Sequence, residues 1–134
     1  TKDGRVKLLD LGIAKVLSDT APEARRVGIG TLVYMPPEQT RDAAGVDHRA
    51  DIYSLGATLY KMLTGQAPFK KKSVEAMVKS IRREPLPDPR IHTSEIPEEV
   101  VEVLNIAMAK KPENRFQSVK EMQEELVALW KRYQ

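Results

Sequence analysis

This 134-residue chain has no cysteine, few aromatic residues and no long hydrophobic run. Without cysteine, the chain forms neither disulfide bonds nor thiolate ligands, and this absence fits the reducing cytoplasm, where we expect the protein. No apolar stretch approaches the length of a membrane-spanning helix, and the N-terminus lacks a signal-peptide pattern. We therefore predict no membrane segment in this chain.

Charge of one sign does not dominate the sequence either. The 22 basic residues barely exceed the 19 acidic ones, and the formal net charge is +3. The densest basic patch consists of Lys70–Lys72 with Lys79, Arg82 and Arg83, and it has no interleaved aromatic side chains that could stack on bases. We expect a solvated surface there and no nucleic-acid partner, and docking of an acidic partner is the alternative.

Short motifs that follow one another in order are the most informative feature of the sequence. Asp10-Leu11-Gly12 precedes a stretch rich in Gly, Ser, Thr and Arg that ends with Met35-Pro36-Pro37-Glu38. Three common residues recur by chance, so the first motif alone carries little weight. Three more motifs follow in order: Asp51-Ile52-Tyr53-Ser54-Leu55-Gly56, Pro68-Phe69 and Lys111-Pro112-Glu113-Asn114-Arg115.

In this order and rough spacing, the motifs resemble those of the C-terminal lobe of Ser/Thr protein kinases, in a style similar to bacterial members of that family. In kinases, a D-F-G triplet holds Mg²⁺ on the ATP phosphates, and an A-P-E triplet ends the mobile activation loop. The resemblance covers essentially the whole chain. It implies a mainly α fold with a small β-strand remnant at the N-terminus, a partial kinase domain over residues 1–134, and an activation segment over residues 10–38.

Other kinase motifs do not occur in the chain: it has no G-x-G-x-x-G loop, no lysine in a V-A-I-K context and no H-R-D-x-x-x-x-N catalytic loop. The resemblance thus implies a fragment whose catalytic Asp and strand lysine lie before Thr1, and which is inactive alone. The complete kinase would use ATP and Mg²⁺, binding ATP through the missing N-terminal lobe, to phosphorylate Ser or Thr of a protein substrate. The alternative is a non-catalytic module, pseudokinase-like or truncated, that binds a partner.

The resemblance assigns a metal-binding role to Asp10. Mg²⁺ needs hard oxygen ligands, and one carboxylate together with the ATP phosphates makes a workable site. Without the phosphates, Asp10 only begins a turn before Gly12. Gly30 and Thr31 match the segment that faces the protein substrate in Ser/Thr kinases.

Three hydroxyl residues of the implied activation segment are candidate phosphorylation sites, namely Ser18, Thr20 and Thr31. A phosphate adds about −1.5 to −2 charges and orders a loop by pairing with arginines. Arg25 and Arg26 lie close in sequence. An ordinary solvated loop is the alternative for Ser18 and Thr20.

Three charged residues have structural counterparts in the family. Glu38 and Arg115 match a buried ion pair that braces the activation segment, and the alternative is two exposed charges that contribute little. Asp51 matches a carboxylate that anchors the catalytic loop through backbone hydrogen bonds. Because that loop is absent from this chain, a solvent-facing carboxylate in the first turn of a helix gains weight.

Hydrophobic periodicity predicts a helix over residues 48–64, with Asp47 as its N-cap and Gly65 as its left-handed C-terminal stop. The apolar residues of this segment surround nearly the whole helix. A helix that is apolar all round is buried all round in a complete fold. Because the neighbouring helix and catalytic loop that the resemblance implies are not in this chain, we expect part of this helix to face solvent as an apolar patch.

Three further helices and a short strand are also predicted, and residues 13–16 are a candidate second strand. One helix is capped by Ser73 and ends before Pro85, and a second begins with Pro97 as its first helical position. The last helix follows a capping box formed by Ser118 and Glu121. Alternating charged and apolar residues over 5–9 predict a short strand.

Overall fold

Helices make up nearly all the regular structure in residues 4–6 and 29–134, which are the residues described by the computed structural model. They are α1 (Ile29–Leu32), η3 (Glu38–Thr40), η4 (Ala43–Gly45), α2 (Arg49–Thr64), α3 (Val74–Arg83), η5 (Pro89–Ile91), α4 (Glu98–Ala107), η6 (Pro112–Asn114) and α5 (Val119–Arg132), where η marks a 3₁₀ helix. The expected mainly α architecture is confirmed. Most of the expected strand over residues 5–9 and all of the candidate second strand lie outside the described residues, and Arg5 and Val6 have irregular backbone.

The predicted N-caps of α3 and α5 are confirmed. The Ser73 hydroxyl accepts a hydrogen bond from the Ala76 amide at 3.2 Å, and the Ser118 hydroxyl accepts one from the Glu121 amide at 3.1 Å. The return bond of the capping box differs, because the Glu121 carboxylate accepts from the amide of Gln117 at 2.7 Å. At both helix starts, backbone N–H groups nevertheless donate hydrogen bonds to side chains within four residues.

Two other helix starts differ from the prediction by one residue. His48, rather than Asp47, is the N-cap of α2, while the Asp47 carboxylate accepts from the Arg49 amide at 2.9 Å and forms an ion pair with the Arg49 guanidinium. Hydrogen bonding from Arg49 lowers the pKa of Asp47 to about 2. Pro97 is the N-cap of α4 and not its first residue, since its backbone is extended (ψ 149°). The predicted stop at Gly65 is confirmed, with φ of 69°.

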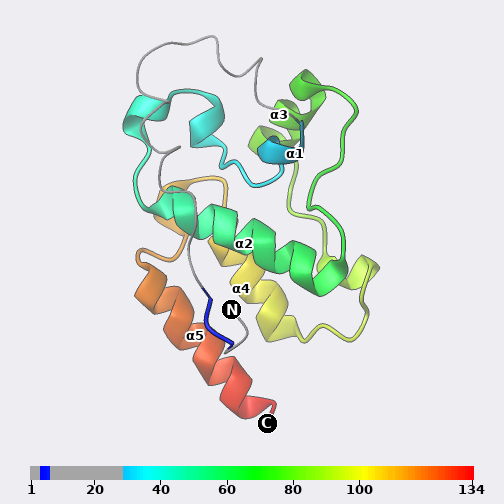
Figure 1. Ribbon diagram of the computed structural model, residues 1–134, viewed down its shortest axis with the longest axis vertical. Helices are drawn as coiled ribbons and strands as arrows, with labels where there is room; N and C mark the ends of the chain where they lie inside the picture. The colour runs from blue at the N-terminus through cyan, green and yellow to red at the C-terminus, as the bar shows by residue number, and fades with distance from the viewer. Residues whose placement is uncertain (1–3, 7–28) are drawn as a thin grey trace.

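Helix α2 crosses the middle of the molecule and packs on α4, which in turn packs on α5, whereas α1 and α3 pack together at the opposite end from the C-terminus (Figure 1). The apolar core follows this arrangement. One cluster joins α2, α4 and α5 through Ile52, Val103, Ala107, Phe116, Met122 and Leu129. A separate cluster beneath α1 and α3 consists of Leu32, Phe69, Met77 and Ile81.

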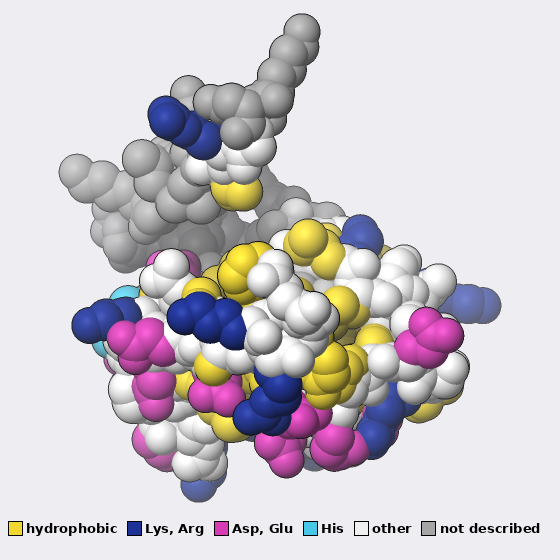
Figure 2. All heavy atoms as spheres, turned by 90° about the horizontal axis from the view of Figure 1, so that it is seen from below, with side chains coloured by type: hydrophobic (Ala, Val, Ile, Leu, Met, Phe, Trp, Pro, Cys, Tyr) yellow, Lys and Arg dark blue, Asp and Glu magenta, His cyan; other side chains and the backbone are white. Residues whose placement is uncertain are grey.

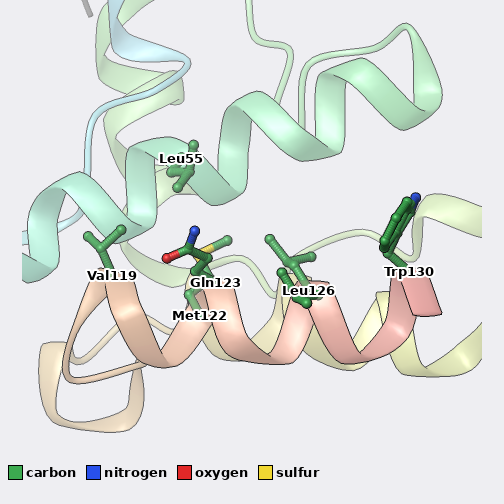
Figure 3. Close-up of a pocket in the computed structure, with 7 residues that line it drawn as sticks. Leu55, Val119, Met122, Gln123, Leu126 and Trp130 are labelled. Carbon is green, nitrogen blue, oxygen red and sulfur yellow. The ribbon is translucent and has the colours of Figure 1, made fainter. Parts of the chain in front are cut away.

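The expectation that part of α2 faces solvent is confirmed. Leu55 is 44% exposed and Met62 is 77% exposed, because α4 and η5 cover only part of the helix in the described structure. Leu55 faces α5, which presents Val119 and Trp130, exposed by 50% and 61%. These residues line an apolar groove of about 450 Å³, with side chains of α5 pointing toward α2 (Figure 3). Seen from below in Figure 2, apolar side chains gather among charged ones on the surface.

The α2–α5 groove, defined by Leu55, Val119, Leu126 and Trp130, is expected to bind a hydrophobic dye. Replacing Leu55 and Trp130 together by glutamine should lower dye fluorescence at least about twofold, and the free energy of unfolding should change by less than about 1 kcal/mol, since both side chains are already exposed. Met62→Gln is the matched control, because Met62 is exposed but does not line the groove. Equal fluorescence of the double variant and the wild type would contradict the assignment.

Candidate functional site

Glu38 and Arg115 lie 77 positions apart in sequence and form an ion pair in the structure. Arg115 Nη1 donates to Glu38 Oε1 at 2.7 Å, and Nη2 donates to Oε2 at 2.8 Å, which is a two-point contact between guanidinium and carboxylate. The Arg115 side chain is completely buried, and the Glu38 side chain is 21% exposed. Glu38 begins η3 and so fixes the end of the segment that starts at α1.

Every N–H of the Arg115 guanidinium has a partner. Its Nε donates to the carbonyl of Ala109 at 2.8 Å, and the two remaining Nη protons reach the carbonyls of Arg49 and Lys110 at 2.9 and 3.3 Å. The guanidinium also lies 5.0 Å from the centre of the Tyr53 ring. Burial raises the pKa of Tyr53, so the ring stays neutral beside this cation. Arg115 therefore ties η3, the start of α2 and the α4–α5 connection together.

The segment from α1 to η3 has two more anchors, which sequence reasoning missed. The Ser54 hydroxyl on α2 donates to the carbonyl of Tyr34 at 2.7 Å. Arg82 on α3 donates from Nε to the hydroxyl of Thr40 at 2.7 Å and from Nη2 to the Thr40 carbonyl. Ser54 belongs to a motif that the sequence displayed, whereas nothing in the sequence around Arg82 pointed to Thr40.

Gly30 and Thr31 are exposed in α1, and Leu32 is buried beside them against α3. Thr31 therefore lies on the surface of a segment held by Ser54, Arg82 and Arg115. This arrangement presents a short stretch of backbone and one hydroxyl to solvent on a rigid base. It is suited to contact another chain.

Asp51 is exposed in the first turn of α2, and within residues 4–6 and 29–134 its side chain has no hydrogen bond or ion pair. An acidic residue at this place interacts favourably with the helix dipole. Its expected anchoring of a catalytic loop stays a prediction.

Asp10, Ser18 and Thr20 lie outside the described residues. In the described ranges, no group of three or more His, Cys, Asp or Glu side chains is arranged to hold a metal ion. A search of the same ranges finds no helix long and apolar enough to cross a membrane. A metal-binding role for Asp10 stays a prediction.

Lys110 is a half-buried cation between α3 and α4. Its Nζ donates to the carbonyl of Ile81 at 2.7 Å and lies 4.6 Å from the centre of the Phe69 ring. No carboxylate of the described chain forms an ion pair with it. Burial lowers the pKa of Lys110 to about 8, against an ordinary value of 10.5.

This lowered pKa predicts that stability rises with pH. Between pH 8 and 10.5 the unfolded chain keeps a proton on Lys110 that the folded chain has lost, so the free energy of unfolding increases as pH rises through this window. Below pH 8 both states are protonated, and the contribution is constant. Urea midpoints of the wild type and Lys110→Met at pH 7.5 and 9.5, below the ordinary pKa of tyrosine (about 10), test this. The wild type should gain stability relative to the variant at the higher pH. Urea midpoints that change in parallel with pH in the two proteins would contradict the lowered pKa of Lys110.

Comparison with known proteins gives a consistent result. The family model described as "Protein kinase domain" matches residues 1–127. A relative named serine/threonine-protein kinase PknB, from Mycolicibacterium smegmatis, is 42% identical over 130 residues, which are 95% of this chain and 20% of that protein. PknB of Mycobacterium tuberculosis is 39% identical over 125 residues, covering 91% of this chain and 20% of that protein.

A third relative, named tyrosine-protein kinase MasK, comes from Myxococcus xanthus and is 41% identical over 116 residues, covering 87% of this chain and 18% of that protein. The chain thus spans about a fifth of the length of the curated relatives it matches. The family match extends over nearly all of its residues, and Glu38, Ser54 and Arg115 supply a braced segment within them. The chain belongs to the protein kinase family.

Proposed function

We propose that this chain is the substrate-facing part of a Ser/Thr protein kinase, which transfers the γ-phosphoryl group of ATP to a hydroxyl of another protein. The observation that carries the proposal is the braced segment from Gly30 to Glu38. A kinase has little covalent chemistry to do, and it works by positioning its substrates and stabilising charge. A segment that is fixed at Tyr34 by Ser54 and at Glu38 by Arg115 provides such positioning.

The choice of serine and threonine as acceptors rests on Gly30 and Thr31. The names of the relatives include both serine/threonine and tyrosine kinases, so similarity alone leaves the acceptor open. In the proposed function, the exposed Thr31 side chain lies beside the acceptor residue of the substrate. It is also a candidate phosphorylation site together with Ser18 and Thr20.

Asp10 is the residue of this chain that would hold Mg²⁺ on the ATP phosphates. The ion would neutralise the phosphate oxygens during transfer. Asp10 would contribute one hard oxygen ligand, and the phosphates and water would complete the shell. The chain has no glycine-rich phosphate loop and no catalytic loop, so its own residues do not make a nucleotide site.

The full-length gene product that contains this chain, incubated with Mg²⁺, ATP and a generic basic protein substrate, should label serine and threonine. Asp10→Ala should remove nearly all transfer, because the metal ion loses its protein ligand. Lys131→Ala, an exposed change on α5, is the control and should leave the rate unchanged. The 134-residue chain alone should neither bind Mg·ATP in calorimetry nor phosphorylate protein.

Three results would contradict the proposal in different ways. If Asp10→Ala were as active as the wild type, Asp10 would not be the metal ligand. Labelling of tyrosine alone would overturn the acceptor class. Failure of the full-length wild type to transfer phosphate at all would favour the alternative, a non-catalytic interaction module.

A further inference from the structure

A second surface hollow lies behind the braced segment, between η3, the end of α3 and the α4–α5 connection. Its volume is about 420 Å³. Six charged side chains line it, and basic ones outnumber acidic ones: Arg41, Arg82, Lys110, Lys111, Glu38 and Asp42. We call this hollow the basic pocket.

The two carboxylates of the basic pocket already have partners. Glu38 is bound at both oxygens by the buried Arg115, and Asp42 accepts from the amide of Ala44 at 2.9 Å. The pair of Glu38 with Arg115 has no net charge. The charge that faces the pocket is therefore positive.

Several cationic donors of the basic pocket have no partner in the described chain. The side chains of Arg41 and Lys111 are exposed. Neither side chain forms a hydrogen bond or an ion pair within residues 4–6 and 29–134. Arg82 uses Nε and Nη2 on Thr40, and this contact holds its guanidinium in place while Nη1 stays open. Lys110 adds a half-buried positive charge without a carboxylate partner. An arginine fork and a nearby lysine are the donors that phosphate groups prefer.

A phosphate monoester suits this pocket better than a carboxylate does. It carries about −1.5 to −2 charges and three acceptor oxygens at neutral pH, so it can use donors from two or three cations together. A carboxylate carries one charge and would leave most of the positive excess unpaired. The half-buried Lys110 would also gain, because an anion nearby favours its charged form.

We propose that the basic pocket binds a phosphorylated serine or threonine of the protein substrate, so that the kinase favours substrates that already carry one phosphate. This assignment of the substrate class rests on the proposed function. The pocket begins at Pro37, six residues after Thr31, and a chain of that length spans at most about 20 Å. A substrate lying along Gly30 and Thr31 would therefore reach the pocket with a phosphorylated residue within about six positions of the acceptor.

The binding test uses the 134-residue chain and needs no catalysis. The probe is a short fluorescent peptide with one phosphoserine among neutral residues, measured by anisotropy, with the same peptide carrying unmodified serine as its control. The phosphopeptide should bind at least about tenfold more tightly than the unmodified peptide, and the difference should shrink as salt rises. Arg41→Glu and Lys111→Glu should each weaken phosphopeptide binding about fivefold or more, since each reverses a charge at the pocket.

Lys131→Glu is the matched control, because it makes the same charge change at an exposed residue of α5 away from the pocket, and it should change binding less than twofold. Thermal melting of each variant checks that it is folded, and the two pocket variants serve as independent tests. Equal binding of the two peptides, or equal losses for Lys131→Glu and the pocket variants, would overturn the proposal. So would competition by inorganic phosphate at the same concentration as the phosphopeptide, because the pocket would then be a site for free anions.

Kinase assays of the full-length protein separate this proposal from the proposed function. Substrates with and without a phosphoserine about six positions from the acceptor should differ in KM, and Lys111→Glu should remove the difference. An active kinase without this preference would overturn the pocket assignment alone. An inactive protein whose chain still binds the phosphopeptide would overturn the kinase proposal and leave phosphopeptide recognition standing.

Discussion

Arg115→Ala is expected to lower the free energy of unfolding by about 4 kcal/mol, and Glu38→Ala by about 3 kcal/mol. Without Glu38, the buried guanidinium keeps only carbonyl acceptors and the Tyr53 ring, and its charge is no longer compensated. Without Arg115, three carbonyls lose their hydrogen-bond donor, and the Glu38 carboxylate loses its cation. Buried groups left without a hydrogen-bond partner lower the free energy of unfolding further. Urea denaturation of both variants measures the two losses.

A double-mutant cycle isolates the interaction itself. Glu38→Leu together with Arg115→Met should cost less than the sum of Glu38→Leu alone and Arg115→Met alone by about 2 kcal/mol or more. Each single change leaves a charge without its partner, and the double change leaves none. Arg132→Ala is the matched control, since Arg132 pairs with Glu99 at 2.9 Å but is 63% exposed, and it should cost less than about 1 kcal/mol. Small, additive effects of Glu38 and Arg115 would mean that the pair behaves as two surface charges.

Gly56→Val is expected to lower the free energy of unfolding by about 3 kcal/mol, because the packing of α2 on α4 leaves no space for a side chain at this residue. A Cβ at Gly56 would lie 2.8 Å from Met108 Cγ and 2.9 Å from Ala107 Cβ. Met108 is buried in an apolar cluster, and the Ala107 Cβ moves only with α4. The two helices would then separate around buried residues such as Tyr53 and Leu104.

Alanine at Gly56 tests the same contact with a smaller perturbation. Gly56→Ala should destabilise by about 1 kcal/mol, since the gain of about 1 kcal/mol in helix propensity offsets part of the overpacking. Adding Ala107→Gly removes the obstructing methyl group, so the combined variant should be more stable than the sum of the single changes indicates. Thr58→Ala, on the exposed side of α2, is the control and should change stability by less than about 0.5 kcal/mol. A Gly56→Ala variant that is more stable than the wild type would show that the contact leaves space for a methyl group at this residue.

Local signals predicted the helix boundaries well. Ser73, Ser118 and Gly65 act through bonds to residues three or four positions away, and such contacts form wherever the local chain is helical. Asp47 and Pro97 were misplaced by one residue because several adjacent residues could cap the same turn. The motif order supported the family, and the same order suggested Glu38 and Arg115 as partners.

The apolar circumference of α2 predicted partial exposure but not which side is exposed. Its apolar residues surround the helix, but burial depends on which other helices reach each side, and a periodicity says nothing about that. In the described structure, α4 covers one side, while Leu55 faces the open groove beside α5. The sequence therefore predicted that part of α2 faces solvent, but not which of its residues do.

By itself, the sequence determined the family, the mainly helical fold, the N-caps of α3 and α5 and the C-terminal stop of α2. Only the tertiary structure decided how distant residues meet: the carbonyls around Arg115, the contact of Arg82 with Thr40 across 42 positions, and the cations that share the basic pocket. Capping depends on backbone geometry within one helical turn, so neighbouring residues in the sequence are enough to predict it. The Arg115 guanidinium reaches carbonyls of distant segments, and the basic side chains come together around one pocket, only after helices far apart in the chain have packed together.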